Sequence, residues 1–476
     1  MIYFFEALKI RMSQVYFVIV FCVLTLYVHD GYYDLIEAKG VMLLWTTIVY
    51  VITMLVSDVV LLCNNSKNKA TFGVFECCLL VFVAICIVSA LLSPMRAVAF
   101  FGSDGCCVGA LTIFLAGVSC ISLSRYLVVE KAMIAVVAVV GIVVFALGIT
   151  DCFDLDLFGW HQGIAASHYD YLSTIGNRDF MDGYLALVLP FFAVLFVFEK
   201  NVRWRLFYGL YLFAGFINLY IAKNDGNLLA FGCGIFLVYY LIRERVHIDR
   251  TIALLSIFIA ASFFVWLMCL FIEPENVVGH SILGMLIHFN WHIGLVIVAF
   301  IMWLFRKRKM PECALKIWIV FSVSVIIGLF LIVVINFDLS FATDRGYIWS
   351  YGLESFAKSS VRYKLFGWGP DCYKTAVYSL VGERIASTWP EATVIANAHN
   401  EIIQYLVTTG VFGMLSYIAV FVSALFSKNS SCNVMSMAAK CSVFAYFCTA
   451  LGNNPMGLNY GILFGMMALG NACRDY

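Results

Sequence analysis

The sequence predicts an all-α polytopic membrane protein with about 14 (12–14) transmembrane helices, cytoplasmic N- and C-termini, and a large, partly helical extracytoplasmic loop. The first observation is composition. Of 476 residues, 63% are hydrophobic and only 12% are charged, whereas soluble globular proteins are about 45–50% apolar and about 25% charged. The second is that apolar runs close to the bilayer-spanning length of about 20 residues recur along the whole chain. The third is that Lys and Arg collect in every second connection, which is typical of cytoplasmic loops.

The composition also excludes several classes of protein and partner. So apolar a chain is not a cytosolic enzyme, a disordered protein, a coiled coil or a small secreted scaffold. Because 30 Lys and Arg nearly balance 29 Asp and Glu, the net charge is only +1, and no nucleic-acid partner is expected. Most of the 17 cysteines lie inside apolar runs, where cysteine acts as a small hydrophobe. No CxxC pair and no zinc-like Cys/His spacing occurs, so neither a metal nor another cofactor is predicted.

Polar breaks divide the apolar runs into individual expected helices. Lys9 and Arg11 precede the first run and no small-residue cleavage site follows it, which predicts an uncleaved first span. The polar residues from Lys223 to Asn227 separate the seventh and eighth runs, which predicts two short or broken helices there. The expected spans are residues 14–29, 41–63, 72–92, 107–124, 132–150, 181–198, 206–222, 227–242, 252–272, 282–304, 315–337, 402–426, 435–451 and 456–472.

Two outer segments, residues 151–180 and 338–400, are longer than ordinary connections between packed helices, which take about 2 to 8 residues. The longer segment contains two expected helices, Arg345–Ala357 and Pro370–Val381, and is predicted to form a folded cap on the outer face. The chain is accordingly divided into N-terminal helices with an outer loop (1–173), a core that includes the cap loop 338–400 (174–426), and a C-terminal transmembrane hairpin (427–476).

The clearest candidate for catalysis is the stretch Ala398–Glu401, which ends the long outer loop and opens the span 402–426. Its histidine, His399, belongs to a residue type that titrates near neutral pH. Transfer of a hydroxyl proton to such a base contributes roughly 10² to 10⁴ in rate. On spacing alone, an interfacial histidine beside a helix cap is an equally good interpretation.

Two arginines are the second candidate. Arg345 opens a predicted loop helix and Arg178 lies just above the sixth span, so both face the outer compartment. The planar guanidinium binds phosphate oxygens in bidentate pairs, so the two arginines can hold a diphosphate. Alternatively they bind ordinary lipid phosphates or pair with Asp344 and Asp179, and for Arg178 this alternative is slightly favoured.

Three other features are weaker. Gly367 and Gly369, which flank a tryptophan, permit a tight turn or a close backbone approach. Lys223 and Asp225 are ionisable residues near membrane depth, where such residues are usually functional, although a plain outer turn explains them equally. Asp154 and Asp156 resemble a metal-binding pair. However, acidic residues are expected throughout a loop on the outer side, where Lys and Arg are few.

Three stretches between residues 174 and 426 carry a resemblance to a known family. The first is Thr174-Ile175-Gly176-Asn177 with Phe180, Gly183, Tyr184, Leu185 and Pro190. The second is Arg345 and Trp349, followed by Phe366-Gly367-Trp368-Gly369-Pro370 and Tyr373. The third and most specific is Ala398-His399-Asn400-Glu401 with Gln404, Gly410 and Gly413. In their order and predicted side of the membrane, they resemble the bacterial O-antigen ligase and O-antigen polymerase superfamily of polytopic glycosyltransferases.

The resemblance implies metal-independent, inverting transfer of a glycan from an undecaprenyl-diphosphate carrier to a hydroxyl acceptor, at the outer face of the cytoplasmic (inner) membrane. The acceptor would be a glycolipid, a second lipid-linked glycan or another cell-envelope component. His399 would be the base, and Arg345 would neutralise the charge that grows on the leaving diphosphate. Binding of the diphosphate or glycan is expected from Arg178, Lys223, Asn177, Gly367, Gly369 and Asn400.

One departure from the family pattern affects the second diphosphate contact. Many members have serine-arginine-glycine where this chain has Asn224-Asp225-Gly226, so Lys223 or Arg178 would have to supply the missing positive charge. The resemblance does not distinguish a ligase from a polymerase.

Two rival functions remain open. A lipid-linked oligosaccharide flippase or exporter has a similar number of helices, but such transporters tend to show internal repeats and midplane binding groups. A metal-dependent glycosyltransferase would use acidic residues of the first outer loop (Asp30, Asp34 and Glu37), which leaves the His399 stretch unexplained.

Overall fold

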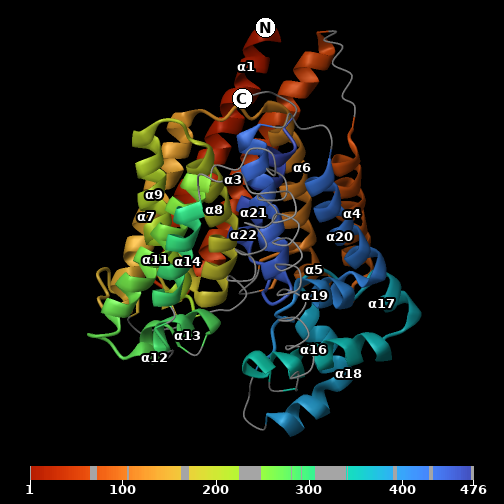
Figure 1. The fold of residues 1–476 in the computed structure, drawn as a ribbon. Helices are drawn as coiled ribbons and strands as arrows, with labels where there is room; N and C mark the ends of the chain where they lie inside the picture. The colour runs from red at the N-terminus through yellow and green to blue at the C-terminus, as the bar shows by residue number, and fades with distance from the viewer. Residues whose placement is uncertain are drawn as a thin grey trace.

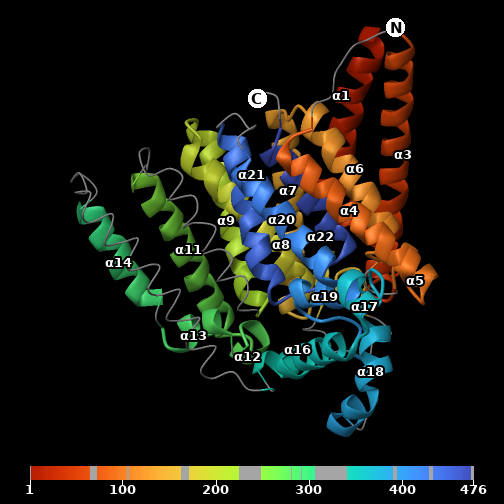
Figure 2. The same cartoon turned by 90° about the vertical axis from the view of Figure 1, so that its right-hand side faces the viewer.

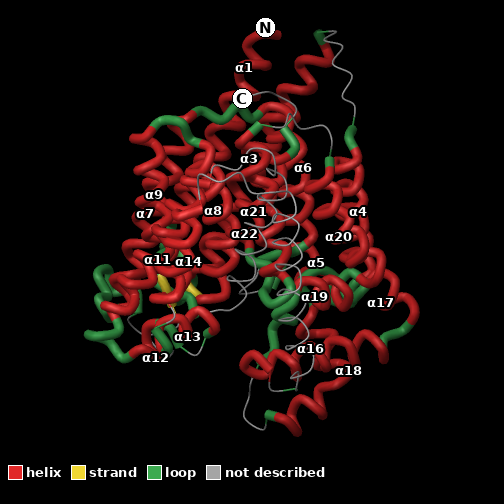
Figure 3. Tube along the Cα trace, in the orientation of Figure 1, coloured by secondary structure: helices red, strands yellow, loops and turns green. Residues whose placement is uncertain are grey.

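The computed structural model of the chain describes residues 2–64, 72–103, 107–161, 171–223, 248–279, 281–290, 292–305, 339, 341–389, 394–427 and 433–472. The regular secondary structure of these residues is helical, apart from one two-stranded antiparallel sheet (Figure 3). In this sheet Tyr171 pairs with Asn177 and Leu172 with Gly176. The all-α class predicted from the composition is therefore confirmed.

The first half of the chain forms long apolar helices, because a backbone in a bilayer must satisfy its hydrogen bonds internally. The elements are α1 (Ile2–Val18), which continues through the π-helical η1 (Ile19–Val23) into α2 (Leu24–Leu26), then α3 (Leu35–Cys63), α4 (Val74–Leu92), α5 (Arg96–Phe101), α6 (Ala110–Tyr126), α7 (Lys131–Cys152), β1 (Tyr171–Leu172), β2 (Gly176–Asn177), α8 (Arg178–Phe198) and α9 (Val202–Ile221).

The second half combines membrane helices with shorter ones. The elements are α11 (Ile248–Met268), α12 (Pro274–Val277), α13 (Ile282–His288), α14 (His292–Phe305), α16 (Phe341–Lys358), α17 (Val361–Phe366), α18 (Tyr373–Thr388), α19 (Glu401–Thr408), α20 (Gly410–Phe426), α21 (Val434–Ala450) and α22 (Gly457–Gly470).

Six of the described helices are long and apolar enough to cross a membrane, and α6, α20, α21 and α22 are shorter apolar helices. The six are Ile2–Leu26, Leu35–Cys63, Val74–Leu92, Lys131–Cys152, Arg178–Phe198 and Asp249–Met268. The protein is thus built as a polytopic membrane protein, while the total of about 14 spans stays a prediction. The expected spans 227–242 and 315–337 lie outside the described residues.

Two spans that were expected to be continuous are interrupted. Residues 402–426 form α19 and α20, because Gly410 has a φ of 71°, a left-handed conformation that ends a helix. Residues 282–304 form α13 and α14, and Asn290, before the break, has a φ of 54°. Each of these two predicted apolar runs is therefore divided into two helices.

Helix α8 occupies the centre of the bundle. Its entire membrane-spanning window is buried, and α9, α21 and α22 pack against it. Figure 2 shows α8 among α9, α20, α21 and α22, with α11 and α14 on one flank and α3, α4 and α6 on the other. The first turn of this central helix carries residues 178 and 179.

The cap lies at one end of the bundle. Figure 1 shows both chain ends at the opposite end from α16, α17 and α18, which is consistent with the predicted topology. α16 contains the expected helix Arg345–Ala357, and α18 begins at Tyr373 rather than Pro370. Side chains of α16 and α18, among them Tyr351, Tyr373 and Val377, form a small apolar core of the cap. The short helix α17 was not predicted.

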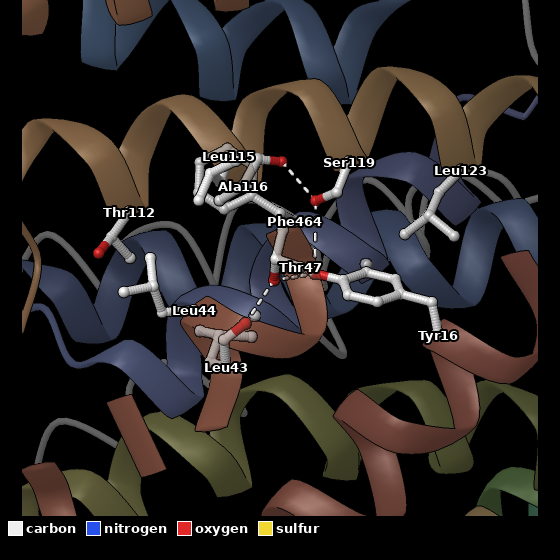
Figure 4. Close-up of a pocket in the computed structure, with 12 residues that line it drawn as sticks. Tyr16, Leu43, Leu44, Thr47, Thr112, Leu115, Ala116, Ser119, Leu123 and Phe464 are labelled. Carbon is white, nitrogen blue, oxygen red and sulfur yellow. Dashed lines mark hydrogen bonds between the residues drawn. The ribbon is translucent and has the colours of Figure 1, made fainter. Parts of the chain in front are cut away.

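A pocket lies between α1, α3, α6 and α22, away from the cap (Figure 4). The hydroxyl groups of Tyr16 and Thr47 are 2.9 Å apart, and Tyr16 donates to the Ser119 hydroxyl at 3.5 Å. Leucines, Phe464 and glycines of α22 make up much of the rest of its lining. The pocket is therefore a mostly apolar gap between packed helices in which the hydroxyl groups hydrogen-bond to one another, and none of the candidate site residues lines it.

Replacing Gly410 by alanine is expected to destabilise the protein by about 1–3 kcal/mol, the cost of a side chain in the left-handed region. The new Cβ would also lie 2.3 Å from the Leu365 carbonyl oxygen. Thermal unfolding in detergent should show a lower midpoint. Gly294→Ala is the control, since nothing lies within 4 Å of its added Cβ, and equal midpoints for the two variants would contradict this account of the helix break.

Candidate active site at the junction of cap and bundle

His399 lies at the N-terminal end of α19, where several hydrogen bonds fix its backbone. Its N–H donates to the Asn454 side-chain oxygen at 2.7 Å. On one side Ala398 donates to Gln404 at 2.9 Å, and on the other the Asn400 side chain accepts from two backbone N–H groups of α19 as an N-cap. His399 itself has a φ of 46°, a strained conformation of the kind that clusters at functional sites.

The His399 ring contacts a carboxylate of the bundle. Its Nδ1 is 3.2 Å from Asp179 Oδ2 and 3.1 Å from the Asn454 side-chain nitrogen. An Nδ1–H that donates to the Asp179 carboxylate leaves the lone pair on Nε2, so that nitrogen can accept a proton. The side chain is 30% exposed, so a hydroxyl group can reach it.

Arg345 reaches the same carboxylate from α16. Its Nη2 donates to Asp179 Oδ1 at 2.8 Å, and its Nη1 donates to the Gly452 carbonyl oxygen. Both side chains of the ion pair are more than four-fifths buried, with exposed fractions of 18% and 17%. One oxygen of Asp179 therefore contacts Arg345 and the other contacts His399, which brings the two predicted catalytic residues together.

Asp179, Asn453 and Asn454 complete the site and were not among the predicted site residues. The Asn453 side chain donates to the backbone oxygen of Asp179 and accepts from the Asn454 N–H at 2.7 Å. The two asparagines sit in the short connection between α21 and α22. Their pairing in sequence between two apolar runs, and the position of Asp179 directly after Arg178, were the available signals.

Three other predicted site residues, Asn177, Arg178 and Lys223, lie at the start of α8 and just after the end of α9. Asn177 caps α8 by accepting from the Asp179 N–H at 2.8 Å, and Arg178 is the first residue of α8. The Lys223 side chain packs near Gly279, since a Cβ added there would lie 3.2 Å from its Cδ. Binding of a diphosphate by these residues stays a prediction.

Gly367 and Gly369 lie where the cap docks on the bundle. Added Cβ atoms would lie 2.2 Å from the Thr408 backbone and 2.6 Å from the Ser93 hydroxyl oxygen, respectively. Gly369 N–H donates to the Thr408 carbonyl at 2.8 Å and Trp368 N–H to the Val407 carbonyl at 3.2 Å. These amides satisfy carbonyls at the end of α19, beside the break, so the segment serves docking, and its expected contact with substrate stays a prediction.

Asp371 extends the same docking contact. Its side-chain oxygen accepts from the backbone N–H groups of Ser103 at 2.7 Å and Val108 at 3.3 Å, in the connection between α5 and α6. Burial raises the pKa of this carboxyl above its ordinary value, although these N–H groups favour the charged form. The cap is therefore tied to the connection between α5 and α6 as well as to α19.

Residues 281–418 match the family model of the O-antigen ligase. The resemblance to the O-antigen ligase superfamily is confirmed. The matched segment includes Arg345, His399 and the whole cap, whereas Asp179 and Asn454 reach the site from outside it. No curated protein matches the chain.

The described residues contain no group of three or more His, Cys, Asp or Glu side chains that could hold a metal ion. Asp156, one of the predicted acidic pair, accepts from the backbone N–H groups of Trp160 and His161 at 2.8 and 3.2 Å. Asp34, which directly precedes α3, pairs with His29 at 2.7 Å.

Proposed function

We propose that this protein is a membrane glycosyltransferase of the O-antigen ligase or polymerase type. It transfers a glycan from an undecaprenyl-diphosphate donor to a hydroxyl acceptor at the outer face of the cytoplasmic membrane. The observation that carries the proposal is the joint contact of Arg345 and His399 with Asp179. The match to the O-antigen ligase family supports the same activity.

The reaction proposed at this site is an in-line displacement with inversion. His399 Nε2 takes the proton of the acceptor hydroxyl while that oxygen forms a bond to the anomeric carbon. The bond from the anomeric carbon to the diphosphate oxygen breaks, and its electron pair leaves with undecaprenyl diphosphate. Asp179 stabilises the imidazolium that results, as the acidic partner does in other His–Asp pairs.

Arg345 has two tasks in this reaction. Its contacts with Asp179 and Gly452 use one N–H of each terminal nitrogen, and a guanidinium has five N–H donors. The remaining donors can face the leaving diphosphate, whose negative charge grows in the transition state. Arg178 and Lys223, on the bundle side, are the candidates for the second diphosphate contact.

The membrane body and the cap divide the substrate between them. A donor whose tail is a polyprenyl chain stays in the bilayer, so its diphosphate reaches the protein at the headgroup level. The Arg345–Asp179–His399 contact lies between the central helix α8 and the cap, where such a diphosphate would meet a water-soluble glycan. The site is compatible both with a ligase, which transfers a finished glycan, and with a polymerase, which adds one repeat unit at a time.

Replacing Arg345 by lysine is expected to reduce the rate of transfer about tenfold, the effect of losing one charge-assisted hydrogen bond of about 1.5 kcal/mol. Lysine keeps the positive charge but cannot contact Asp179 and Gly452 in a planar fork. Arg384→Lys is a matched control, because Arg384 pairs with Glu354 on the cap surface. If both variants transferred glycan at the native rate, the role of Arg345 would be excluded.

The assay of the proposed function uses proteoliposomes that contain the native protein, a lipid-linked glycan donor and a hydroxyl acceptor. New glycosidic product is expected, and its size separates a single transfer from polymerisation. Movement of donor across the bilayer without any product would favour a flippase and overturn the proposal.

A further inference from the structure

Glu401 places a carboxyl group inside the bundle, two residues after His399. The side chain is fully buried, with an exposed fraction of 0%. A buried carboxyl is costly unless hydrogen bonds satisfy it, and ionisable groups inside membrane helices are usually functional. The catalytic steps proposed above make no use of Glu401.

Three tyrosines from three different helices surround this carboxyl. Tyr446 of α21 donates to Oε1 at 2.7 Å, and Tyr417 of α20 donates to Oε2. Tyr460 of α22 donates to Oε2 at 3.5 Å and also contacts the hydroxyl of Tyr405. Within the described residues, no basic side chain forms an ion pair with Glu401, so the tyrosine hydroxyls satisfy the carboxyl.

The tyrosine hydrogen bonds link the start of α19, which follows His399, to the ends of α21 and α22 that flank Asn454. Glu401 opens α19, directly after the turn that holds His399. Tyr446 lies in the last turns of α21 and Tyr460 in the first turn of α22, on either side of the connection that holds Asn454. Asn454 accepts from the His399 N–H and contacts its Nδ1.

We propose that Glu401 is a positioning residue for His399. Its hydrogen bonds to Tyr417, Tyr446 and Tyr460 hold the start of α19 in register with α20, α21 and α22. The His399 ring then faces Asp179 and Asn454 at hydrogen-bond distance, with Nε2 open to the acceptor. Glu401 contacts no substrate. The inference rests on the proposed function for its catalytic consequence, but the placement of His399 can be measured without activity.

The kinetic test compares Glu401→Ala with Glu401→Gln in the glycan-transfer assay. Glu401→Ala should lower kcat by about 10²-fold, the loss expected for a displacement of a catalytic group by about 1 Å, with an unchanged KM for the donor. Glu401→Gln should keep most of the native kcat, because its amide oxygen accepts from a tyrosine hydroxyl on one side and its amide N–H donates to a tyrosine hydroxyl oxygen on the other. A loss in Glu401→Gln as large as in Glu401→Ala would overturn the positioning role, as would an unchanged kcat in Glu401→Ala.

The second test measures the rate at which diethyl pyrocarbonate modifies His399, followed by mass spectrometry of the His399 peptide. Glu401→Ala should change this rate several-fold, while the rate at the exposed His29 stays the same. Tyr446→Phe, which removes one donor to the carboxyl, should change it in the same direction and serves if Glu401→Ala does not fold. Equal His399 rates in all variants would overturn the inference. Absence of glycan transfer by the native protein would instead overturn the proposed function and leave this test standing.

Discussion

Replacement of His399 by alanine is expected to reduce glycan transfer by about 10² to 10⁴-fold, the usual contribution of a general base. Without the imidazole, the acceptor hydroxyl must lose its proton to water, and the Nε2 that the Asp179 contact leaves free is gone. The rate should be measured in proteoliposomes with donor and acceptor at saturation, so that the loss is assigned to kcat.

His29→Ala is the matched control for this substitution. His29 also pairs with a carboxylate, since its Nδ1 is 2.7 Å from Asp34 Oδ2, but it is 65% exposed and lies in the connection between α2 and α3. Its removal should leave the rate unchanged. A native rate in His399→Ala, in protein that elutes as a folded species, would exclude His399 as the base.

Replacement of Asp179 by asparagine is expected to reduce the rate by about 10²-fold or more. The amide nitrogen of asparagine can donate to His399 Nδ1, which would stabilise the tautomer whose proton is on Nε2. That tautomer cannot accept the hydroxyl proton. The substitution also removes the charge that pairs with Arg345 at 2.8 Å. The matched control is Asp34→Asn, which changes the exposed pair with His29 and should have no effect.

The result for Asp179→Asn distinguishes a catalytic pair from a structural ion pair. If Asp179 only anchored the cap, Asp179→Asn would lower the unfolding midpoint but leave kcat of the remaining folded protein at the native value. We expect the opposite, a large fall in kcat with a small change in the midpoint.

The class of fold and the residues of the cap could be predicted because their signals are local. Apolar runs of bilayer length gave α3, α4, α7 and α8 without reference to any contact. His399 and Arg345 could be proposed because the sequence places each of them at a predicted helix start next to a long polar loop. Both residues contact Asp179, because the fold places the first turn of α8 beside the cap.

The rest of the site depends on contacts between distant parts of the chain. Asn454 meets His399 across 55 residues, and the pair of asparagines after α21, although it stands out between apolar runs, does not indicate which distant residue it contacts. The break between α19 and α20 is similar, because the carbonyls of Val407 and Thr408 accept from amides of the cap. A glycine at position 410 permits the break, but the docked cap is what satisfies it.

The most direct test of the account is a double-mutant cycle in the glycan-transfer assay, with native protein, His399→Ala, Asp179→Asn and the combined variant. If Asp179 acts mainly through His399, adding Asp179→Asn to His399→Ala should slow transfer by far less than Asp179→Asn does alone, because only the contact with Arg345 is left to change. If instead the two losses multiply, Asp179 and His399 act independently, and the proposed base with its carboxylate partner is contradicted.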